Sequence, residues 1–349
     1  MSQNLFNKTL IIGLGLIGGS FAKAIRKQQI SKEIFAFDID IESIDLAKND
    51  GVIDGGVDDL QFIEDLSSFD LIVIATPLSA YEEIFDEIAY RVSPKTIVID
   101  LGSLKSFINK ILPKNLENNF IGCHPIAGSE KINFENSEVD LFLGKKFVIC
   151  KNPENSNEIV KKVENLAKSI GCNVDFIDAQ KHDEIYALVS HLPQFLSFLT
   201  KEFSPKNIEG EFLNKAFRLD NSDPDIWADI FELNEENLEE FYLEFFDNLE
   251  EEISIMKHGQ FVLPNQASPS FTEHEIQYFE ENFAPIFFRA LIVLSYLKIP
   301  AIKNFKIHAG FGFKDFTSII EILNFAPEKL QNLISQNQKK ILKLFSSIS

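Results

Sequence analysis

Residues 8–27 read KTLIIGLGLIGGSFAKAIRK, in which an apolar, β-branched run passes through a glycine-rich turn into an amphipathic segment. The turn holds Gly13, Gly15 and Gly18 in a GxGxxG arrangement. Gly13 permits a tight turn, Gly15 lets the backbone approach a pyrophosphate, and Gly18 permits close packing of a helix on the strand. The N-terminus of that helix attracts the anion. The stretch therefore predicts the strand, turn and helix that open a dinucleotide-binding domain.

The next strand-like run ends at Asp38, 20 residues after Gly18. A carboxylate at this place can accept hydrogen bonds from both hydroxyls of an adenosine ribose and repels a 2′-phosphate. No arginine occurs in the segment DIDIES, residues 38–43. We therefore expect NAD rather than NADP. The competing interpretation is a structural glycine turn with a surface aspartate.

Short apolar runs alternate with amphipathic segments up to about residue 178. KTLIIG, EIFAFD, DLIVIAT, KTIVID, NFIGCH and KFVIC indicate strands, and residues 17–29, 79–92 and 104–112 indicate helices. Continuous apolar strands covered on both faces are typical of a parallel sheet. The first part of the chain is therefore predicted to be a doubly wound α/β domain of the Rossmann type.

Beyond Asp178 the pattern becomes helical, with apolar residues three and four apart in residues 182–202 and 235–258. Glycine, two prolines and polar residues in KHGQFVLPNQASPSF, residues 257–271, indicate a linker. We therefore expect a Rossmann domain over residues 1–177, a helical domain over 178–264 and a helical C-terminal extension over 265–349.

The extension contains a faint echo of the helical domain. DPDIWADIFELNEENLEEFYLEF, residues 223–245, can be laid on APEKLQNLISQNQKKILKLFSSI, residues 326–348, so that Pro224 matches Pro327. A duplication would make the extension a degenerate repeat of the helical domain. The alternative is chance similarity between amphipathic helices.

The charge balance excludes several classes of partner. The 349 residues include 33 Lys and Arg against 53 Asp and Glu, a net charge of −20, so phosphate-binding contacts to nucleic acid are disfavoured. The most apolar stretch, residues 285–297, is too short to span a bilayer and contains Arg289, and the N-terminus lacks a signal-peptide core. The three cysteines show no metal-binding spacing. We expect a cytoplasmic protein with no membrane, nucleic-acid or metal partner.

Two histidines stand where a ligand site is expected. His124 follows the strand-like NFIGC in HPIAGSE, and the carboxyl ends of parallel strands line the ligand crevice of open α/β sheets. His191, in SHLPQ, lies near the start of the helical half, where a second wall of a cleft would be expected. The others are expected to be solvated or structural: His182, His258, His274 and His308.

Taken together, these motifs resemble those of the prephenate dehydrogenases of aromatic amino acid biosynthesis. The resemblance covers about residues 8–260, through GLGLIGGS, ATPLSAY, DLGSLKS, HPIAGSE, SHLPQ and FRLDNSDPDIWADI. It implies NAD-dependent oxidative decarboxylation of prephenate to 4-hydroxyphenylpyruvate, and a homodimer formed through the helical domain. Some relatives use arogenate instead and yield tyrosine directly.

The resemblance also assigns roles to residues. His124 would take the proton of the ring hydroxyl as hydride leaves, and Ser103 would position that histidine and the hydroxyl. Arg218 would bind a substrate carboxylate, because a planar guanidinium suits bidentate capture. The other residues expected to line the substrate pocket are His191, Ser129, Glu130 and Gln194. Those expected to bind the cofactor are Gly13, Gly15, Leu16, Ile17, Gly18, Asp38, Thr76 and Pro77.

Two departures from the family pattern affect these assignments. Many relatives read HLPH where this chain has HLPQ, so either His191 or Gln194 would face the substrate. Relatives often read GFRDTTR where this chain has EFLNKAFR, which keeps only the final Arg218. The later GFGFKDFTS is closer to that motif but puts Ser318 in place of the arginine. A second copy of this kind would mimic a partner subunit or add to an interface.

Three alternatives stay open. Arogenate specificity depends on whether the pocket accepts an amino group or a keto group, and prephenate is the expected substrate. A β-hydroxyacid-type dehydrogenase would need a catalytic lysine after the sheet, but Lys181 lacks the glycine-rich surroundings of that family. An NAD-sensing or structural Rossmann protein would keep the glycine turn without needing His124 and Arg218 together.

Overall fold

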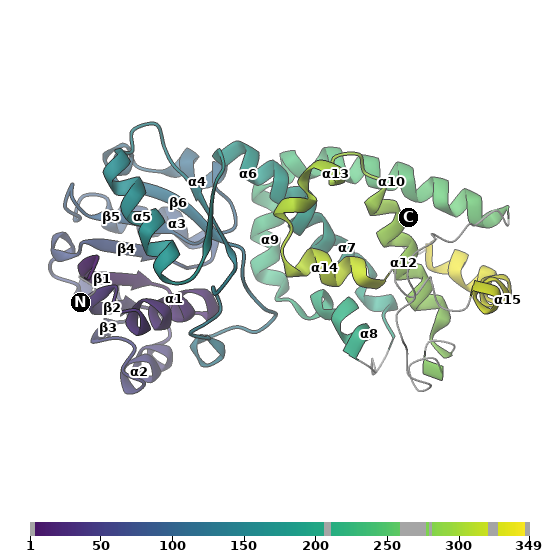
Figure 1. Cartoon of the computed structure of the whole chain (residues 1–349), viewed down its shortest axis with the longest axis horizontal. Coiled ribbons are helices and arrows are strands. Elements are labelled where there is room, and N and C mark those ends of the chain that lie inside the picture. The colour runs from purple at the N-terminus through teal and green to yellow at the C-terminus, as the bar shows by residue number, and fades with distance from the viewer. Residues whose placement is uncertain (1–3, 206–210, 259–276, 279–280, 320–326, 346–349) are drawn as a thin grey trace. The chain divides into compact units, whose positions relative to one another are not determined.

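The computed structural model describes residues 4–205, 211–258, 277–278, 281–319 and 327–345 (Figure 1). The chain divides into two compact units. Unit 1 comprises Met1–Asp183 and Asp223–Asn234, and unit 2 comprises Glu184–Ser222 and Glu235–Ser349. The three-part division expected from the sequence stays a prediction. Most of the expected linker, from residue 259 onward, lies outside the described residues.

Unit 1 is built on an eight-stranded sheet with the strand order β3-β2-β1-β4-β5-β6-β7-β8. Its strands are β1 (Phe6–Ile12), β2 (Ser31–Phe37), β3 (Gly55–Val57), β4 (Leu71–Ile74), β5 (Ile97–Asp100), β6 (Phe120–Pro125), β7 (Lys146–Cys150) and β8 (Asn173–Phe176). All neighbouring strands are parallel except β6 and β7, which are antiparallel. The doubly wound fold is confirmed, with two reversed strands, β7 and β8, that the sequence pattern did not indicate.

Helices cover both faces of this sheet. The helices of unit 1 are α1 (Leu16–Lys27), α2 (Ile41–Asn49), α3 (Tyr81–Ile88), α4 (Ser106–Ile111), α5 (Asn157–Ser169) and α9 (Pro224–Leu233), and α6 (Ala179–Tyr186) runs on into unit 2. On β1, Ile11 joins the apolar cluster that contains Phe21 of α1, whereas Ile12 joins the cluster that contains Phe85 of α3. Alternate residues of β1 therefore pack into two separate cores, as expected for a strand buried on both faces of the sheet.

Helix α9 belongs to unit 1 although it follows helices of unit 2 in the sequence. Ile230 is buried in the apolar cluster beside α3, and Trp227 packs against the same cluster. Asp229 accepts a hydrogen bond from the backbone N–H of Ser79 (3.2 Å). The side chain of Asn234, which follows α9, donates to the carbonyl of Asp183 (3.1 Å), so the middle of α9 and its C-terminal end are both tied to unit 1.

The described part of unit 2 contains helices and no strands. These are one π-helical turn, η6 (Ala187–His191), the helices α7 (Leu192–Thr200), α8 (Glu211–Ala216), α10 (Glu235–Lys257), α12 (Phe283–Leu297), α13 (Ile302–Phe305), α14 (Phe311–Ser318) and α15 (Pro327–Phe345), and the 3-10 turns η7 (Lys201–Phe203), η8 (Arg218–Asn221) and η9 (Lys306–His308). Helix α12 packs against α10 and α15. The helical half expected after Asp178 is thus confirmed.

The two segments of the sequence echo fold differently. The first is broken after α9 at Asn234, and its halves belong to different units. The second forms the single helix α15 in its described part. Within the described ranges, no helix is long and apolar enough to cross a membrane, and no group of side chains suits a metal ion.

Candidate active site

The glycine-rich turn joins β1 to α1. Gly13 has φ +97°, a conformation that side-chain-bearing residues rarely adopt, and a Cβ there would stand 2.7 Å from the carbonyl oxygen of Ala75. A Cβ on Gly18 would stand 1.9 Å from the carbonyl oxygen of Gly13. At Gly15, by contrast, no heavy atom lies within 4 Å of the Cβ position. Two glycines therefore shape the turn, and the third faces open space.

The N-terminus of α1 fits an anionic group. Gly15 is its N-cap, so no side chain caps the first turn, and that turn contains no acidic residue. The first backbone N–H groups of a helix lack partners within the helix and attract negative charge. The space beside Gly15 would admit the pyrophosphate of a dinucleotide, with Leu16 and Ile17 supplying the next N–H groups.

Asp38 lies beside the same turn, at the end of β2. One carboxylate oxygen accepts from the backbone N–H of Leu14 (2.5 Å) and the other from that of Asp40 (2.8 Å). These bonds fix the carboxylate next to the glycine turn, where the ribose of a bound dinucleotide would lie. The position of Asp38 therefore fits the same ligand as the space at Gly15.

Thr76 and Pro77 follow β4 and stand on the other side of the turn. The Thr76 methyl group is 3.0 Å from the position a Cβ on Gly13 would take, so the threonine borders the glycine turn. Its Oγ1 is buried and has no hydrogen-bond partner among the described residues. A buried hydroxyl in this state favours a ligand group at the turn, because an unmet hydrogen bond costs free energy. Pro77 opens the 3-10 turn η3 (Leu78–Ala80).

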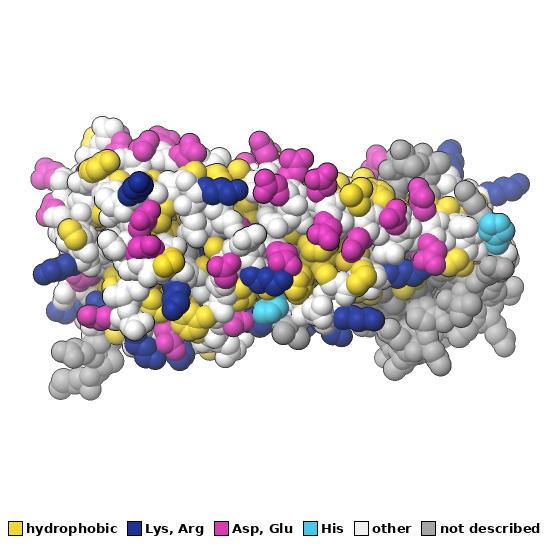
Figure 2. All heavy atoms as spheres, turned by 90° about the horizontal axis from the view of Figure 1, so that it is seen from above, with side chains coloured by type: hydrophobic (Ala, Val, Ile, Leu, Met, Phe, Trp, Pro, Cys, Tyr) yellow, Lys and Arg dark blue, Asp and Glu magenta, His cyan; other side chains and the backbone are white. Residues whose placement is uncertain are grey.

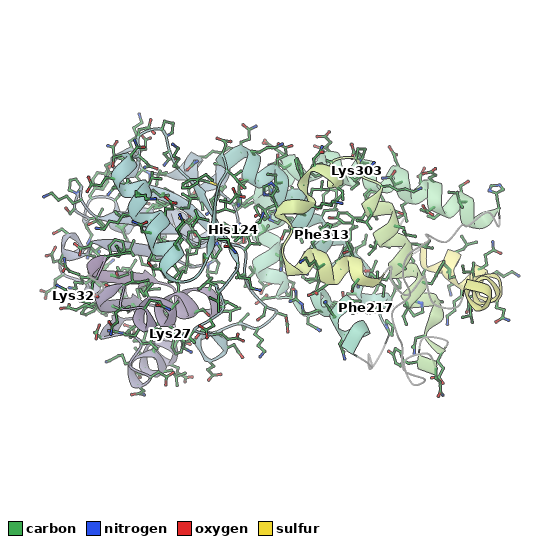
Figure 3. All side chains as sticks on the ribbon, in the orientation of Figure 1. Lys27, Lys32, His124, Phe217, Lys303 and Phe313 are labelled. Atoms are coloured by element: carbon green, nitrogen blue, oxygen red, sulfur yellow. The ribbon has the colours of Figure 1, made fainter. Side chains whose placement is uncertain are left out.

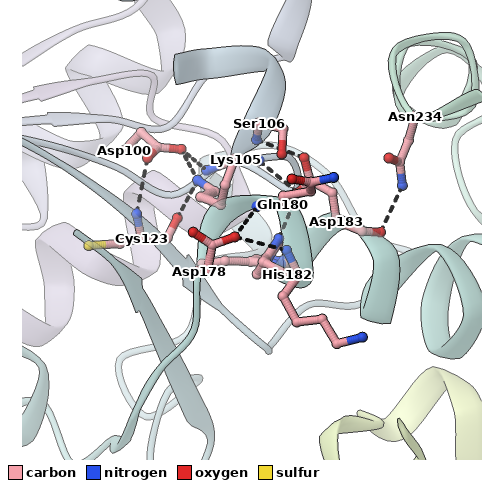
Figure 4. A network of polar contacts seen from close by, with 12 residues as sticks. Asp100, Lys105, Ser106, Cys123, Asp178, Gln180, His182, Asp183 and Asn234 are labelled. Carbon is pink, nitrogen blue, oxygen red and sulfur yellow. Dashed lines mark hydrogen bonds and ion pairs between the residues drawn. The ribbon is translucent and has the colours of Figure 1, made fainter. Parts of the chain in front are cut away.

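His124 lies in β6, close to its carboxyl end (Figure 3). Its Nδ1 is 2.9 Å from Nε2 of His182, whose own Nδ1 is 2.7 Å from a carboxylate oxygen of Asp183. Figure 4 shows that carboxylate accepting also from the backbone N–H groups of Lys105 (2.9 Å) and Ser106 (2.7 Å). Asp183, His182 and His124 thus form a chain of side chains that ends at His124.

The surroundings of His182 assign the proton positions in this chain. Burial, and then the positive charge of Lys105, lower the pKa of His182 well below its usual value, so the ring is neutral at neutral pH. Asp183 is a carboxylate that accepts from two backbone N–H groups, so it also accepts a hydrogen bond from Nδ1–H of His182, and the lone pair of the neutral ring lies on Nε2. That lone pair accepts a hydrogen bond from Nδ1–H of His124. His124 is therefore held with its own Nε2 unprotonated, as a general base requires.

His182, which the sequence left with a solvated or structural role, is placed by the structure next to His124. Its side chain is fully buried and contacts His124 directly. Helix α6, which carries it, begins where Asp178 accepts hydrogen bonds from the backbone N–H groups of Gln180 and Lys181. The adjacent pair His182–Asp183 was the one signal in the sequence, and it is too short to suggest a contact 58 residues back along the chain.

A buried ion pair holds the strand ends beneath His124. The Lys105 ammonium pairs with Asp100 and donates to the carbonyl of Cys123 (2.6 Å), and Asp100 accepts from the backbone N–H of Cys123 (3.0 Å). The Lys105 side chain is 1% exposed, and that of Asp100 is fully buried. Burial raises the pKa of Asp100, whereas the positive charge of Lys105 lowers it. This network fixes β5 and β6 side by side just before the catalytic candidate.

The other expected residues of unit 1 lie in loops at the strand ends. Ser103 is half-buried between β5 and α4 and forms no hydrogen bond with any described residue. Ser129 and Glu130 follow β6, and the exposed Ser129 accepts from the backbone N–H of Lys131 (3.2 Å). The contact expected between Ser103 and His124 is therefore not formed here, and His182 makes the contact to His124 instead.

The expected residues of unit 2 gather around α7 and η8. His191 is 1% exposed and ends the π-helical turn, an element that is rare and often found at functional sites. Gln194 is also buried, and its amide donates to the carbonyl of Leu219 (2.8 Å) and accepts from Ser222 (3.2 Å). Gln194 thereby holds the turn η8, whose first residue is Arg218. The structure groups these residues in unit 2, and it groups the cofactor residues with His124 in unit 1.

Comparison with known proteins identifies the family. The model "Prephenate dehydrogenase, nucleotide-binding domain" matches residues 21–176, and the model "Prephenate dehydrogenase, dimerization domain" matches residues 178–274. The prephenate dehydrogenases of Bacillus subtilis and Lactococcus lactis are 29% and 33% identical over 245 and 194 residues, or 66% and 54% of this chain. These alignments span 64% and 52% of the relatives, less than two thirds of either.

The chain is also similar to a relative with another name and to solved structures. A cyclohexadienyl dehydrogenase of Zymomonas mobilis is 26% identical over 240 residues, which is 65% of this chain and 81% of that protein. The Aquifex aeolicus prephenate dehydrogenase in complex with hydroxyphenyl propionate and NAD+ is 29% identical, with a TM-score of 0.67, covering 80% of this chain and 97% of that one. The Synechocystis arogenate dehydrogenase, at 21% identity and a TM-score of 0.60, covers 73% of this chain and 93% of that one and shares the fold. This chain belongs to the prephenate dehydrogenase family.

Proposed function

We propose that the chain is an NAD-dependent prephenate dehydrogenase that converts prephenate to 4-hydroxyphenylpyruvate and carbon dioxide. The observation that carries the proposal is the chain of side chains from Asp183 through His182 to His124, at the end of a central strand in the unit that also contains the glycine turn. NAD, when bound, would supply the acceptor for the hydride that leaves the ring carbon bearing the hydroxyl. The family to which the chain belongs supports the same assignment.

The residues around β1 would hold the cofactor. The N–H groups at Gly15 would bind the pyrophosphate, and Asp38 would bind the adenosine ribose. The buried hydroxyl of Thr76 would form a hydrogen bond with the ligand. A carboxylate at the ribose repels a 2′-phosphate, which favours NAD over NADP. Gly13, Gly18, Leu16, Ile17 and Pro77 would shape the same site.

His124 would move the proton. Its Nε2 takes the proton of the ring hydroxyl while hydride departs from the same carbon, and a carbonyl forms there. The electron pair of the bond to the ring carboxylate then enters the ring as carbon dioxide leaves, and the oxygen recovers the proton from His124. Atoms and charges balance without another reactant. The contact with His182 keeps His124 in the tautomer that can accept the proton.

Other residues would bind the substrate. We assign one substrate carboxylate to the Arg218 guanidinium. We assign roles toward the substrate to Ser103, Ser129 and Glu130 in unit 1 and to His191 and Gln194 in unit 2, with Gln194 acting through the turn η8 that it holds. The family's C-terminal model is a dimerisation domain, and we infer a homodimer through unit 2 that works in the cytoplasm. Arogenate is the second candidate substrate, because a relative from Methanocaldococcus jannaschii is named a probable arogenate/prephenate dehydrogenase.

The test is NADH formation by the purified chain with NAD, with prephenate and arogenate offered separately. Turnover of prephenate is expected. Turnover of arogenate alone would keep the mechanism and change the substrate, whereas no turnover with either, in protein that binds NAD, would contradict the proposal.

The matched variant for this test is His124→Asn. Loss of the general base should lower kcat by about a thousandfold, and NAD binding should persist because the glycine turn is unchanged. Full activity in the variant would remove His124 from its role.

A further inference from the structure

Helices beyond residue 274, where the dimerisation-domain match ends, form the surroundings of Arg218. Helix α14 packs against α7, α8 and η8, so it contacts both sides of the segment that contains the arginine. Helix α12 packs against α10. The C-terminal segment is therefore an integral part of unit 2.

One carboxylate of that segment contacts Arg218 directly. The Nε of Arg218 donates to a carboxylate oxygen of Asp315 over 2.7 Å. The Asp315 side chain is only 6% exposed, against 26% for Arg218. The Lys215 ammonium lies 3.9 Å from the other carboxylate oxygen. Because solvent is largely excluded from Asp315, this pair is screened less than a surface salt bridge.

The backbone on either side of Arg218 is held by other contacts. Arg289 of α12, 1% exposed, pairs with Asp220 over 2.6 Å, and its guanidinium lies over the ring of Phe217 at 4.9 Å. Gln194 binds the carbonyl of Leu219. Residues 217, 219 and 220 are thus fixed without Asp315. What Asp315 adds is the orientation of the Arg218 side chain.

We propose that Asp315 is a positioning residue for Arg218. The carboxylate fixes the guanidinium through Nε and turns its outer edge to receive a substrate carboxylate. A guanidinium has five N–H donors in a rigid plane, so one bond at Nε sets the direction of the others. Asp315 lies in GFGFKDFTS, the later stretch that is close to the family's arginine motif but has Ser318 in place of the arginine. The inference rests on the proposed function, which gives Arg218 its substrate.

The test compares the steady-state kinetics of Asp315→Asn, Asp315→Ser and Asp315→Glu with those of the unmodified chain. Both Asn and Ser remove the charge, and the KM for prephenate should rise about tenfold while kcat changes less than about threefold. The KM for NAD should not change. Asp315→Glu restores a carboxylate and should recover most of the loss. Either neutral variant suffices if the other does not fold, as judged by its urea unfolding transition.

Two controls separate positioning from a structural role. Glu251→Gln removes the more exposed of the two ion pairs between α10 and Lys298 (2.7 Å) and leaves the pair with Glu252 (2.8 Å). Both pairs join the C-terminal segment to the rest of unit 2, and the variant should leave the KM for prephenate unchanged. In an Arg218→Gln background, Asp315→Asn should add almost nothing, because its effect acts through the arginine. A full additional tenfold rise there, or an unchanged KM in the single variants, would overturn the proposal. No turnover of prephenate or arogenate by the unmodified chain would instead refute the proposed function, and this inference with it.

Discussion

The tautomer of His124 depends on a residue that never touches the substrate in the proposed reaction. His182 presents a lone pair only while it stays neutral, and its neutrality follows from complete burial and from the nearby Lys105 ammonium. A second proton on His182 would place a donor opposite the Nδ1 proton of His124.

The same burial makes His182 a source of acid instability. Its folded pKa is depressed, so below its ordinary pKa near 6.5 the unfolded chain binds a proton that the folded chain does not. The unfolding free energy therefore carries no penalty from His182 above that pH, and it decreases as the pH falls below it. Between about pH 7.5 and about pH 5.5 the loss should be about 1 kcal/mol. Urea unfolding of the unmodified chain at both values should reveal it.

His182→Asn is the control for this pH effect, because it removes the titrating group. The raised pKa values of Asp100 and Asp183 act in the opposite direction, since the folded state then binds more protons, but both carboxylates are present in both proteins. The variant should show a smaller decrease in unfolding free energy between the two pH values. An equal decrease would mean that His182 already titrates normally in the folded protein.

In the turn between β1 and α1, one glycine leaves room for the ligand and another allows close packing of the backbone. Gly15→Ala would place a methyl group in open space where the pyrophosphate is proposed to bind, so the KM for NAD should rise about tenfold with little loss of stability. Gly18→Ala would push a methyl group against the Gly13 carbonyl and should destabilise the fold by about 3 kcal/mol. NAD kinetics and thermal unfolding of both variants measure the contrast. Equal effects of the two substitutions on stability would contradict it.

The central elements could be predicted from the sequence because their apolar runs are continuous. The expected strands β1, β2, β4, β5, β6 and β7 are all present, but β3 and β8 were missed. The sequence of β3 is GGV, and β8 has exposed ends, so neither short edge strand contains a buried apolar run. The reversal of β7 against β6 depends on the loop between them, which gives no periodic signal.

The candidate site was predictable only where a motif defines it. Gly13, Gly15 and Asp38 stand at fixed offsets within one βαβ unit, so their positions follow from local sequence. The contacts of His124 with His182 and of Arg218 with Asp315 join residues 58 and 97 positions apart. Neither pair has a spacing that any local rule would detect, and both appear only once the chain has folded.

At the scale of the whole molecule, the net charge of −20 acts against an anionic substrate. Figure 2 shows acidic side chains spread over the visible face with basic ones among them. Salt screens such a field within roughly 8 Å at physiological ionic strength. We expect moderate salt to leave the KM for prephenate unchanged or to lower it, as kinetics at several potassium chloride concentrations would reveal. A steep rise would mean that local attraction by Arg218 outweighs the bulk field.

The chain passes between the two units after Asp183, after Ser222 and after Asn234, and this has a consequence for its synthesis. When Asp183 leaves the ribosome, the whole sheet exists but α9 does not, and 51 more residues (234 − 183) must be translated before it does. At about 5 to 20 residues per second this takes roughly 3 to 10 s. Until then the apolar face of unit 1 that receives Ile230 stays uncovered. The core of unit 1 is therefore complete only after α9 has been translated. A ribosome that stalls before then would release a chain whose sheet is complete but whose apolar cluster beside α3 is still exposed to solvent.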